Sequence, residues 1–367
     1  MRLERISPVT GRVASSATAM TTADARAVAD RAEAGFRAWA DMGPNARRAV
    51  LSKAAEAIEQ RRDEFVQAMT DEVGATAGWA MFNLMLAASM TREAAALTTR
   101  IGGEVIPSDK PGCLAMSVRE PVGVLLGIAP WNAPIILGVR AIAAPLACGN
   151  AVTLKASELC PRTHELIIEA FAGAGFPEGV VNLVTNDPKD AGEVVGALID
   201  HPAVRCINFT GSTAVGRVIA RRCAEQLKPC LLELGGKASL IVLEDANLDE
   251  ADAIRVANDS EYGLSAAVFT GDAACGLRVA RQIRSGMCHI NGSTVHDEAQ
   301  MPFGGVGASG YGRFGGAYGP LFVCDLAFAA EKAPFGLSEV NNPVIACPAG
   351  EGDMALDALI VMQRPEP

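Results

Sequence analysis

Five short apolar runs, separated by segments with helical spacing, constrain the fold of this chain more than any other feature. Two of the intervening segments, 163–172 and 215–225, repeat apolar residues at intervals of three to four. Strand, helix and strand repeated at this spacing predict βαβ units around a parallel sheet, and therefore an α/β fold. The predicted strands are 122–129, 151–154, 180–184, 204–209 and 238–243.

The stretch 121–139, "PVGVLLGIAPWNAPIILGV", carries no charge and is long enough to cross a bilayer. Pro130 and Pro134 would break a spanning helix in its middle. A buried strand, a tight turn and a buried helix explain the stretch better, so we expect no membrane partner. Upstream, the chain has the periodicity of helices from Pro44, and an alternating pattern in 109–119 predicts a hairpin arm near 103–121.

Composition excludes several classes of function. The 367 residues carry a formal charge of −10 with a pI near 5.1, which argues against nucleic acid as a partner. Ten cysteines without a CxxC pair and only four histidines argue against a metal site. Residues 1–10 lack the apolar run of a secretory leader, so we expect a reducing compartment, the cytoplasm.

One glycine motif has the spacing of a dinucleotide-binding loop. Gly305, Gly307 and Gly310 form "GVGASG", and an acid, Asp325, follows Gly305 at the distance that the motif requires. The motif also needs a strand directly before it and an apolar helix after it. The flanking residues 300–303 and "YGRFGG" predict neither, so we interpret this motif as a coincidence of spacing.

Four other stretches are more specific because each ends a predicted strand or follows one. They are "PWNAP" (130–134), "LKASE" (154–158), "FTGSTAVG" (209–216) and "LELGGK" (232–237). In parallel sheets, ligands bind beyond these carboxyl ends. The order and spacing of the four resemble the aldehyde dehydrogenase superfamily over residues 1–249, and the resemblance resumes up to 316. The stretch "INGSTVHDEAQMPFGG" is most similar to members that act on aromatic aldehydes, such as salicylaldehyde or vanillin dehydrogenases.

The resemblance implies a role for individual residues. Lys155 would bind the adenosine ribose, and Glu158 would bind its hydroxyl groups and repel a 2′-phosphate, which favours NAD over NADP. Asn132 would stabilise an oxyanion, and Glu233 would act as the general base that activates water. Ser212 would meet the pyrophosphate at a helix N-terminus. The complete set implied for the cofactor is Pro130, Trp131, Lys155, Ser157, Glu158, Gly211, Ser212, Gly216, Leu234 and Gly235.

Two family motifs have no counterpart in the sequence. In the family, a cysteine in a "GQxC"-type stretch attacks the aldehyde, and an "EIFGP"-type stretch binds the nicotinamide ribose. Here "VLEDANLDEA" passes directly into "DAIRVANDSEYGL", so roughly a hundred residues or more are missing near 250. We therefore expect a Rossmann-like cofactor-binding domain in 1–249, a shortened α/β catalytic domain in 250–316 and a divergent tail in 317–367.

The remaining cysteines offer weak replacements for the nucleophile. Cys206, Cys230 and Cys288 lie in strand-like runs, and Cys275 lies near the start of a helix. Gly307 also stands where the family commonly has Lys. The stretch "AYGPLFVCDLAF" departs from the strand with which relatives pair their subunits. The sequence therefore does not decide whether the chain forms a homo-oligomer of the family type.

Three hypotheses follow from this pattern. The chain is a working enzyme with a relocated nucleophile, an NAD-binding protein without catalysis, or a truncated remnant. The favoured interpretation is descent from an NAD-dependent enzyme that oxidises an aromatic aldehyde to the carboxylic acid, with its activity impaired or lost.

Overall fold

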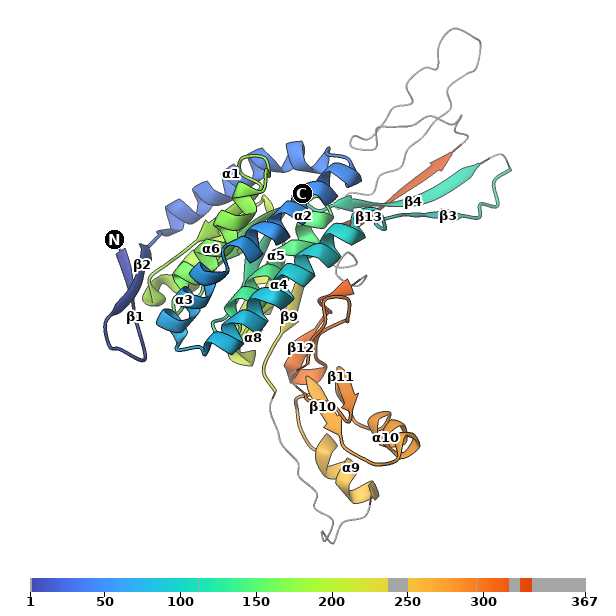
Figure 1. Cartoon of the computed structure of the whole chain (residues 1–367). Helices are drawn as coiled ribbons and strands as arrows, with labels where there is room; N and C mark the ends of the chain where they lie inside the picture. Colours follow the sequence, from blue (N-terminus) through green and yellow to red (C-terminus); the bar gives the residue numbers. More distant parts are fainter. Residues whose placement is uncertain (1, 112, 237–249, 295, 317–323, 332–367) are drawn as a thin grey trace.

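A parallel sheet forms the centre of the computed structural model, which describes residues 2–111, 113–236, 250–294, 296–316 and 324–331 (Figure 1). The strand order is β12-β9-β8-β5-β6-β7. The five strands from β9 to β7 are parallel, and β12 pairs antiparallel with β9. Their bounds are β5 (Val124–Ile128), β6 (Ala151–Lys155), β7 (Val181–Val184), β8 (Val204–Thr210), β9 (Cys230–Glu233) and β12 (Gly310–Tyr311).

The sequence pattern predicted four of these strands, β5 to β8, to within two residues at each end. From β5 the chain adds β6 and β7 on one side, then returns to add β8 and β9 on the other. In sheets of this kind, ligands bind beyond the carboxyl ends of the strands where the order reverses, which here is between β5 and β8. The predicted strand 238–243 lies outside the described residues.

Helices cover both faces of the sheet, and this explains why its strands are mostly apolar. In β5, Leu125 belongs to the core on one face and Leu126 to the core on the other. The first face is covered by α2 (Pro44–Gln60), α3 (Arg62–Val73), α4 (Ala77–Leu97), α5 (Pro134–Ala147) and α6 (Pro161–Gly173). The second is covered by α1 (Thr22–Ala40), α7 (Ala191–Ile199) and α8 (Thr213–Glu225).

The uncharged stretch 121–139 forms β5, a turn and the first part of α5, as predicted. Among the described helices, none is both long and apolar enough to cross a membrane.

A three-stranded arm extends from the main body (Figure 1). It contains β3 (Glu104–Ile106) and β4 (Leu114–Pro121), which pair antiparallel within the region 103–121 where we expected a hairpin arm. Its third strand, β13 (Cys324–Glu331), pairs along the whole of β4. The sequence did not predict β13, because "CDLAFAAE" does not alternate polar and apolar residues. Asp325 lies in this strand, paired with Glu120, so the acid that follows the glycine motif belongs to the arm.

Residues 250–316 form a small unit with its own βαβ pattern. Helix α9 (Glu250–Asn258) precedes β10 (Ser265–Val268), and α10 (Ala273–Ala280) connects β10 to the parallel strand β11 (Met287–Ile290). At the other end of the chain, a hairpin of β1 (Arg2–Ile6) and β2 (Val13–Thr18) precedes α1. The sequence did not predict this hairpin.

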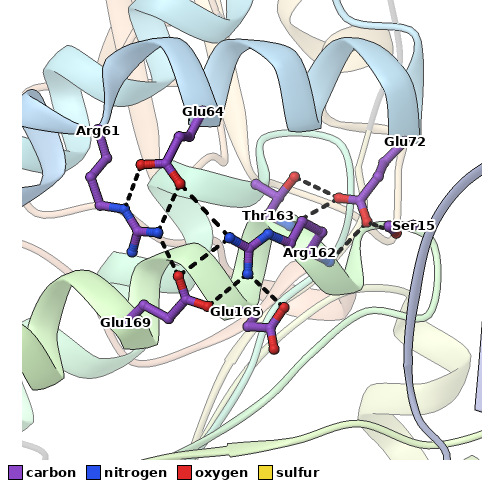
Figure 2. Close-up of polar contacts among 8 residues, drawn as sticks. All are labelled: Ser15, Arg61, Glu64, Glu72, Arg162, Thr163, Glu165 and Glu169. Carbon is purple, nitrogen blue, oxygen red and sulfur yellow. Dashed lines mark hydrogen bonds and ion pairs between the residues drawn. The ribbon is translucent and has the colours of Figure 1, made fainter.

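The N-terminus of α6 is capped by a residue from another helix. Its N-cap residue, Cys160, supplies no side-chain hydrogen bond, and Glu72 of α3 takes this role (Figure 2). One carboxylate oxygen accepts from the N–H of Arg162 at 2.8 Å and from the Ser15 hydroxyl. The other accepts from the N–H of Thr163 at 2.9 Å and its hydroxyl at 2.7 Å. Glu72 is 1% exposed, and burial raises its pKa although these bonds oppose the shift.

A second set of carboxylates in Figure 2 is much more exposed. Arg162 pairs with Glu165 at 2.8 Å and with Glu169 at 2.7 Å, and Arg61 pairs with Glu64 at 2.9 Å. These carboxylate side chains keep between 39% and 50% of their surface exposed. Solvent therefore screens their charges, and we expect each pair to contribute little to stability.

His164, on the first turn of α6, connects two loops at the carboxyl end of the sheet. Its Nδ1 accepts from the N–H of Ser157 at 3.0 Å, so Nδ1 carries no proton. Its Nε2 lies 3.2 Å from the carbonyl oxygen of Pro134 and therefore donates. Complete burial lowers the pKa of His164 to about 4, which keeps this neutral tautomer in place. The ring thereby ties the turn after β6 to the start of α5.

Replacing Glu72 with Ala should lower the free energy of unfolding by about 3 kcal/mol, because buried donors at the start of α6 lose their acceptor. Urea unfolding of the two proteins measures the difference. Glu165→Ala is the matched control and should cost less than about 1 kcal/mol, because its carboxylate is half exposed. Equal losses in the two variants would contradict the capping role.

Acid should destabilise the protein through His164. In the unfolded chain this residue takes up a proton below pH 6.5, whereas in the fold it stays neutral down to about pH 4. Its contribution to stability is therefore complete above pH 6.5 and falls as the pH drops towards 4, by about 3 kcal/mol in total. Urea unfolding at pH 7, 6 and 5 should show a shallower loss in His164→Gln than in the natural protein. An equal loss of unfolding free energy with falling pH in the two proteins would rule out His164 as the source of the acid sensitivity.

Candidate functional site

The loop after β5 is held from one side and open on the other. Pro130, Trp131 and Asn132 connect β5 to α5, which begins at Pro134. The indole N–H of Trp79 in α4 donates to the carbonyl oxygen of Asn132 at 3.1 Å and fixes the backbone of the loop. Trp131 is 48% exposed, and Asn132 is exposed as well. The amide predicted to stabilise an oxyanion thus lies on a fixed backbone just after the carboxyl end of β5.

The loop after β8 leads directly into the N-terminus of α8. Ser212 is the N-cap, and its hydroxyl accepts from the N–H of Val215 at 3.3 Å. The N–H of Gly211 donates to the carbonyl oxygen of Glu233 at 3.0 Å. A Cβ at Gly211 would lie 2.5 Å from the Phe209 ring, so a larger residue here would force that ring to move. The exposed helix end carries a partial positive charge and suits an anionic group.

Gly216 and Leu234 bring α8 close to the loop after β9. A Cβ at Gly216 would lie 2.5 Å from the Leu234 side chain. The N–H of Leu234 donates to the carbonyl oxygen of Ser309 at 3.1 Å, and the Ser309 hydroxyl donates to the Gly235 carbonyl at 2.7 Å. Ser309 is completely buried. The unit 250–316 therefore holds the "LELGG" loop in position.

The glycine motif has a structural role at this junction. Its residues form a 3-10 turn, Gly307–Ser309, and the strand β12, rather than the entrance to a helix. Gly310 has φ of +102° and packs against the backbone of Leu232, where a Cβ would lie 2.0 Å from the carbonyl oxygen. The interpretation of this motif as a coincidence of spacing agrees with these contacts. Sequence reasoning missed Ser309, which lies inside the motif.

Lys155 and Glu158 form an ion pair at the carboxyl end of β6. The Lys155 ammonium lies 2.5 Å from Oε1 of Glu158, which also accepts from the Asn186 amide at 2.8 Å. Burial would raise the pKa of Glu158, but the Lys155 charge and these hydrogen bonds outweigh it and hold the pKa below its usual value. The pair therefore offers a charged acceptor beside a charged donor. The Ser157 hydroxyl is used within the turn, where it accepts from the N–H of Leu159.

Glu233 ends β9 and is 7% exposed. Burial raises the pKa of Glu233 most strongly, and the charge of Asp297 raises it further. The charge of Arg140 and a hydrogen bond with Thr210 lower this pKa. The net result is an increase. Arg140 in α5 pairs with Asp297, and its guanidinium lies 4.2 Å from the centre of the Phe303 ring. Burial and a raised pKa make a carboxylate a better proton acceptor than one in water, as a general base requires.

A pocket adjoins this cluster between α4, α5 and the segment 297–316. Arg140, Asp297 and Phe303 line it together with Met90 and Leu97. Sequence reasoning missed Arg140 and Asp297 as site residues. A signal was available for Arg140, because it is the single charge in the apolar stretch 121–147.

The cysteines considered as nucleophiles lie in strands or in a helix, and none of them lies in the loop of Asn132. Cys206 is buried in β8, and Cys288 lies in β11, where burial raises its pKa. Cys275 lies in α10, and its sulfur accepts from Arg278 at 3.2 Å. Cys230 begins β9. We expected it to be fully buried, but it is half-buried.

The chain is similar to known proteins in sequence and in structure. Residues 1–251 and 249–327 match the model of the aldehyde dehydrogenase family. Vanillin dehydrogenase of Pseudomonas fluorescens is 42% identical over 438 aligned positions, which cover 85% of this chain and 91% of that protein. Salicylaldehyde dehydrogenase of Pseudomonas sp. (strain C18) is 36% identical over 439 positions, with the same coverage.

Among solved structures, salicylaldehyde dehydrogenase from Pseudomonas putida G7, complexed with salicylaldehyde, superposes with a TM-score of 0.88 and 34% identity. The match covers 93% of this chain and 96% of that chain. Both sequence alignments are longer than the 367 residues of the chain, so each includes relative sequence without a counterpart here. The family match extends over most of the sequence and the fold agrees with it, so the chain belongs to the aldehyde dehydrogenase family.

Proposed function

We propose that this chain binds NAD at the carboxyl end of its parallel sheet and that its capacity to oxidise an aromatic aldehyde is lost or severely reduced. The charged pair of Lys155 and Glu158 is the observation that carries the first part. An ionised carboxylate accepts hydrogen bonds from two vicinal ribose hydroxyls and repels a phosphate at the same place. This preference supports NAD over NADP.

The other loops fit the remaining parts of a dinucleotide. Gly211 leaves the backbone beside the N-terminus of α8 free of side-chain bulk, and Ser212 begins the helix with its positive end exposed. A pyrophosphate is the group that such a helix end binds. NAD, when bound, supplies a nicotinamide ring that accepts a hydride. Asn132 and Glu233 would serve on the substrate side, as an amide donor to an oxyanion and as a proton acceptor.

The second part of the proposal rests on the region near residue 250. The two stretches that match the family model meet there, and the alignments with relatives exceed the length of the chain. We infer that the missing sequence held the catalytic cysteine and that 250–316 is what remains of the catalytic domain. Without a thiol beside Asn132, covalent attack on an aldehyde has no nucleophile.

An aromatic substrate is supported by the relatives, two of which are named for vanillin and salicylaldehyde. The pocket beside Arg140 is lined by apolar side chains, the Phe303 ring, the Arg140 guanidinium and the carboxylates of Glu93, Asp297 and Glu298. A working enzyme with Cys275 as nucleophile is the alternative. Cys275 is partly exposed, but it lies in α10 rather than near the oxyanion amide.

Isothermal titration should give similar dissociation constants for NAD and ADP-ribose, within about threefold, because the adenosine end carries most of the binding. NADP should bind at least about tenfold more weakly, since its phosphate meets Glu158.

Glu158→Gln should weaken NAD binding about tenfold and narrow the preference for NAD over NADP. The exposed control Glu165→Gln should leave the NAD affinity and this preference unchanged. Saturating NAD at a hundred times its dissociation constant should add about 2.7 kcal/mol to the unfolding free energy. Equal affinity for NAD and NADP would contradict the role of Glu158.

Oxidation of vanillin, salicylaldehyde or benzaldehyde should be slower than in an intact relative by about 10⁴-fold or more, because the loss of a catalytic nucleophile typically costs that much. NADH absorbance at high enzyme concentration measures the rate. Steady NADH formation that disappears in Cys275→Ala would refute the proposed loss and establish the relocated nucleophile. An equal residual rate in that variant would support the proposal.

A further inference from the structure

A pair of thiols and a phenol converge at the junction of α8, β9 and β12. Cys223 lies in the last turn of α8, Cys230 is the first residue of β9 and Tyr311 is the last of β12. The Cys230 sulfur lies 2.9 Å from the Tyr311 hydroxyl oxygen. Cys230 packs against the buried cluster to which Cys223 belongs. The N–H of Lys228, two residues before Cys230, donates to the carbonyl oxygen of Cys223 at 2.9 Å and brings the two cysteines together.

The loop between the two cysteines is fixed, which keeps the thiols together. The Lys228 ammonium donates to the carbonyl oxygens of Ile199, at 2.5 Å, and His201, at 2.6 Å. Leu227 adopts a left-handed conformation with φ of +52°, which reverses the chain between helix and strand. The thiols thus meet through a held turn rather than through two freely moving segments.

The environment makes the two thiols unequal. The hydrogen bond from Cys223, opposed by burial and aided by Tyr311, lowers the pKa of Cys230 to about 7. The pKa values of Cys223 and Tyr311 are raised in return, so both remain protonated donors. Cys223 is completely buried, whereas Cys230 is partly exposed. A thiolate that solvent can reach is the reactive form of cysteine.

We propose that Cys230 is a thiol-oxidation site for a hydroperoxide and that Cys223 resolves its sulfenic acid to an intramolecular disulfide. The Cys230 thiolate attacks one peroxide oxygen, the O–O bond breaks, and the other oxygen leaves with a proton as water or an alcohol. The Cys223 thiol then gives up its proton and attacks the Cys230 sulfur, and hydroxide leaves as water. Two thiols lose two electrons in total, and the peroxide gains them.

The cross-link would fasten the last turn of α8 to the start of β9. The opposite ends of these two elements carry Ser212 and Glu233, at the candidate nucleotide site. Cys160 and Cys275 have different surroundings. Cys160 is completely buried, and its pKa lies well above the usual value. Cys275 is partly exposed and contacts Arg278 rather than a second thiol.

The test uses the full-length reduced protein with a small excess of hydrogen peroxide at pH 7. Free thiols are blocked with an isotopically light reagent, disulfides are reduced, and the released thiols are labelled with a heavy one. Peptide mass spectrometry should show Cys223 and Cys230 as the pair that takes the heavy label. In Cys223→Ser, dimedone should trap a sulfenic acid at Cys230, and Cys230→Ser should leave Cys223 unoxidised. Cys275→Ser should behave as the natural protein.

Tyr311→Phe separates a donor from a packing residue, because it removes only the hydroxyl group. Oxidation of Cys230 should slow about tenfold relative to Cys275 in the same sample, since one hydrogen bond to the thiolate is lost. Oxidation of Cys275 as fast as Cys230 in the natural protein would overturn the proposal. So would a disulfide that joins other cysteines, or peroxide that leaves the pair reduced. These outcomes need no variant to fold.

Discussion

Burial of a parallel sheet on both faces is the constraint on which the rest of the molecule depends. Leu125 and Leu126 are neighbours in β5, yet they belong to cores on opposite faces of the sheet. Parallel strands cannot be joined by tight turns, so helices must cross over between them and supply both layers. The same requirement brings the carboxyl ends of all five parallel strands to one edge. Asn132, Lys155, Ser212 and Glu233 share that edge although they are far apart in sequence.

Long-range polar contacts then turn this edge into a defined site. His164 joins the turn after β6 to the start of α5 with a neutral ring that has one acceptor and one donor. Ser309 holds the loop after β9 through its backbone and its hydroxyl group. Both side chains are completely buried, and each satisfies polar backbone groups that would otherwise lack a partner. The candidate site residues therefore depend on His164 and Ser309, which hold their loops in position.

The sequence predicted the elements that depend on local pattern. β5 to β8 were apparent as apolar runs because strands buried on both faces have mostly apolar sequences. α6 and α8 were apparent from the helical spacing of their apolar residues. β13 was missed because its sequence does not alternate, and β12 because two residues leave no period to detect. Glu72, His164, Arg140 and Ser309 could not be predicted as partners, because the contacts that define them join distant parts of the chain. Of these four residues, only Arg140 could be noticed in the sequence, because it is the single charged residue in the apolar stretch 121–147.

The junction of β9 with β12 has a consequence for the solubility of the sheet. A parallel sheet that ended at β9 would expose a row of unpaired backbone groups, and an open edge of this kind recruits strands from other molecules. Here Gly310 and Tyr311 pair with Glu233 and Leu232. A short strand from residues 250–316 thus covers part of the β9 edge. Removal of these residues would expose that edge and favour aggregation.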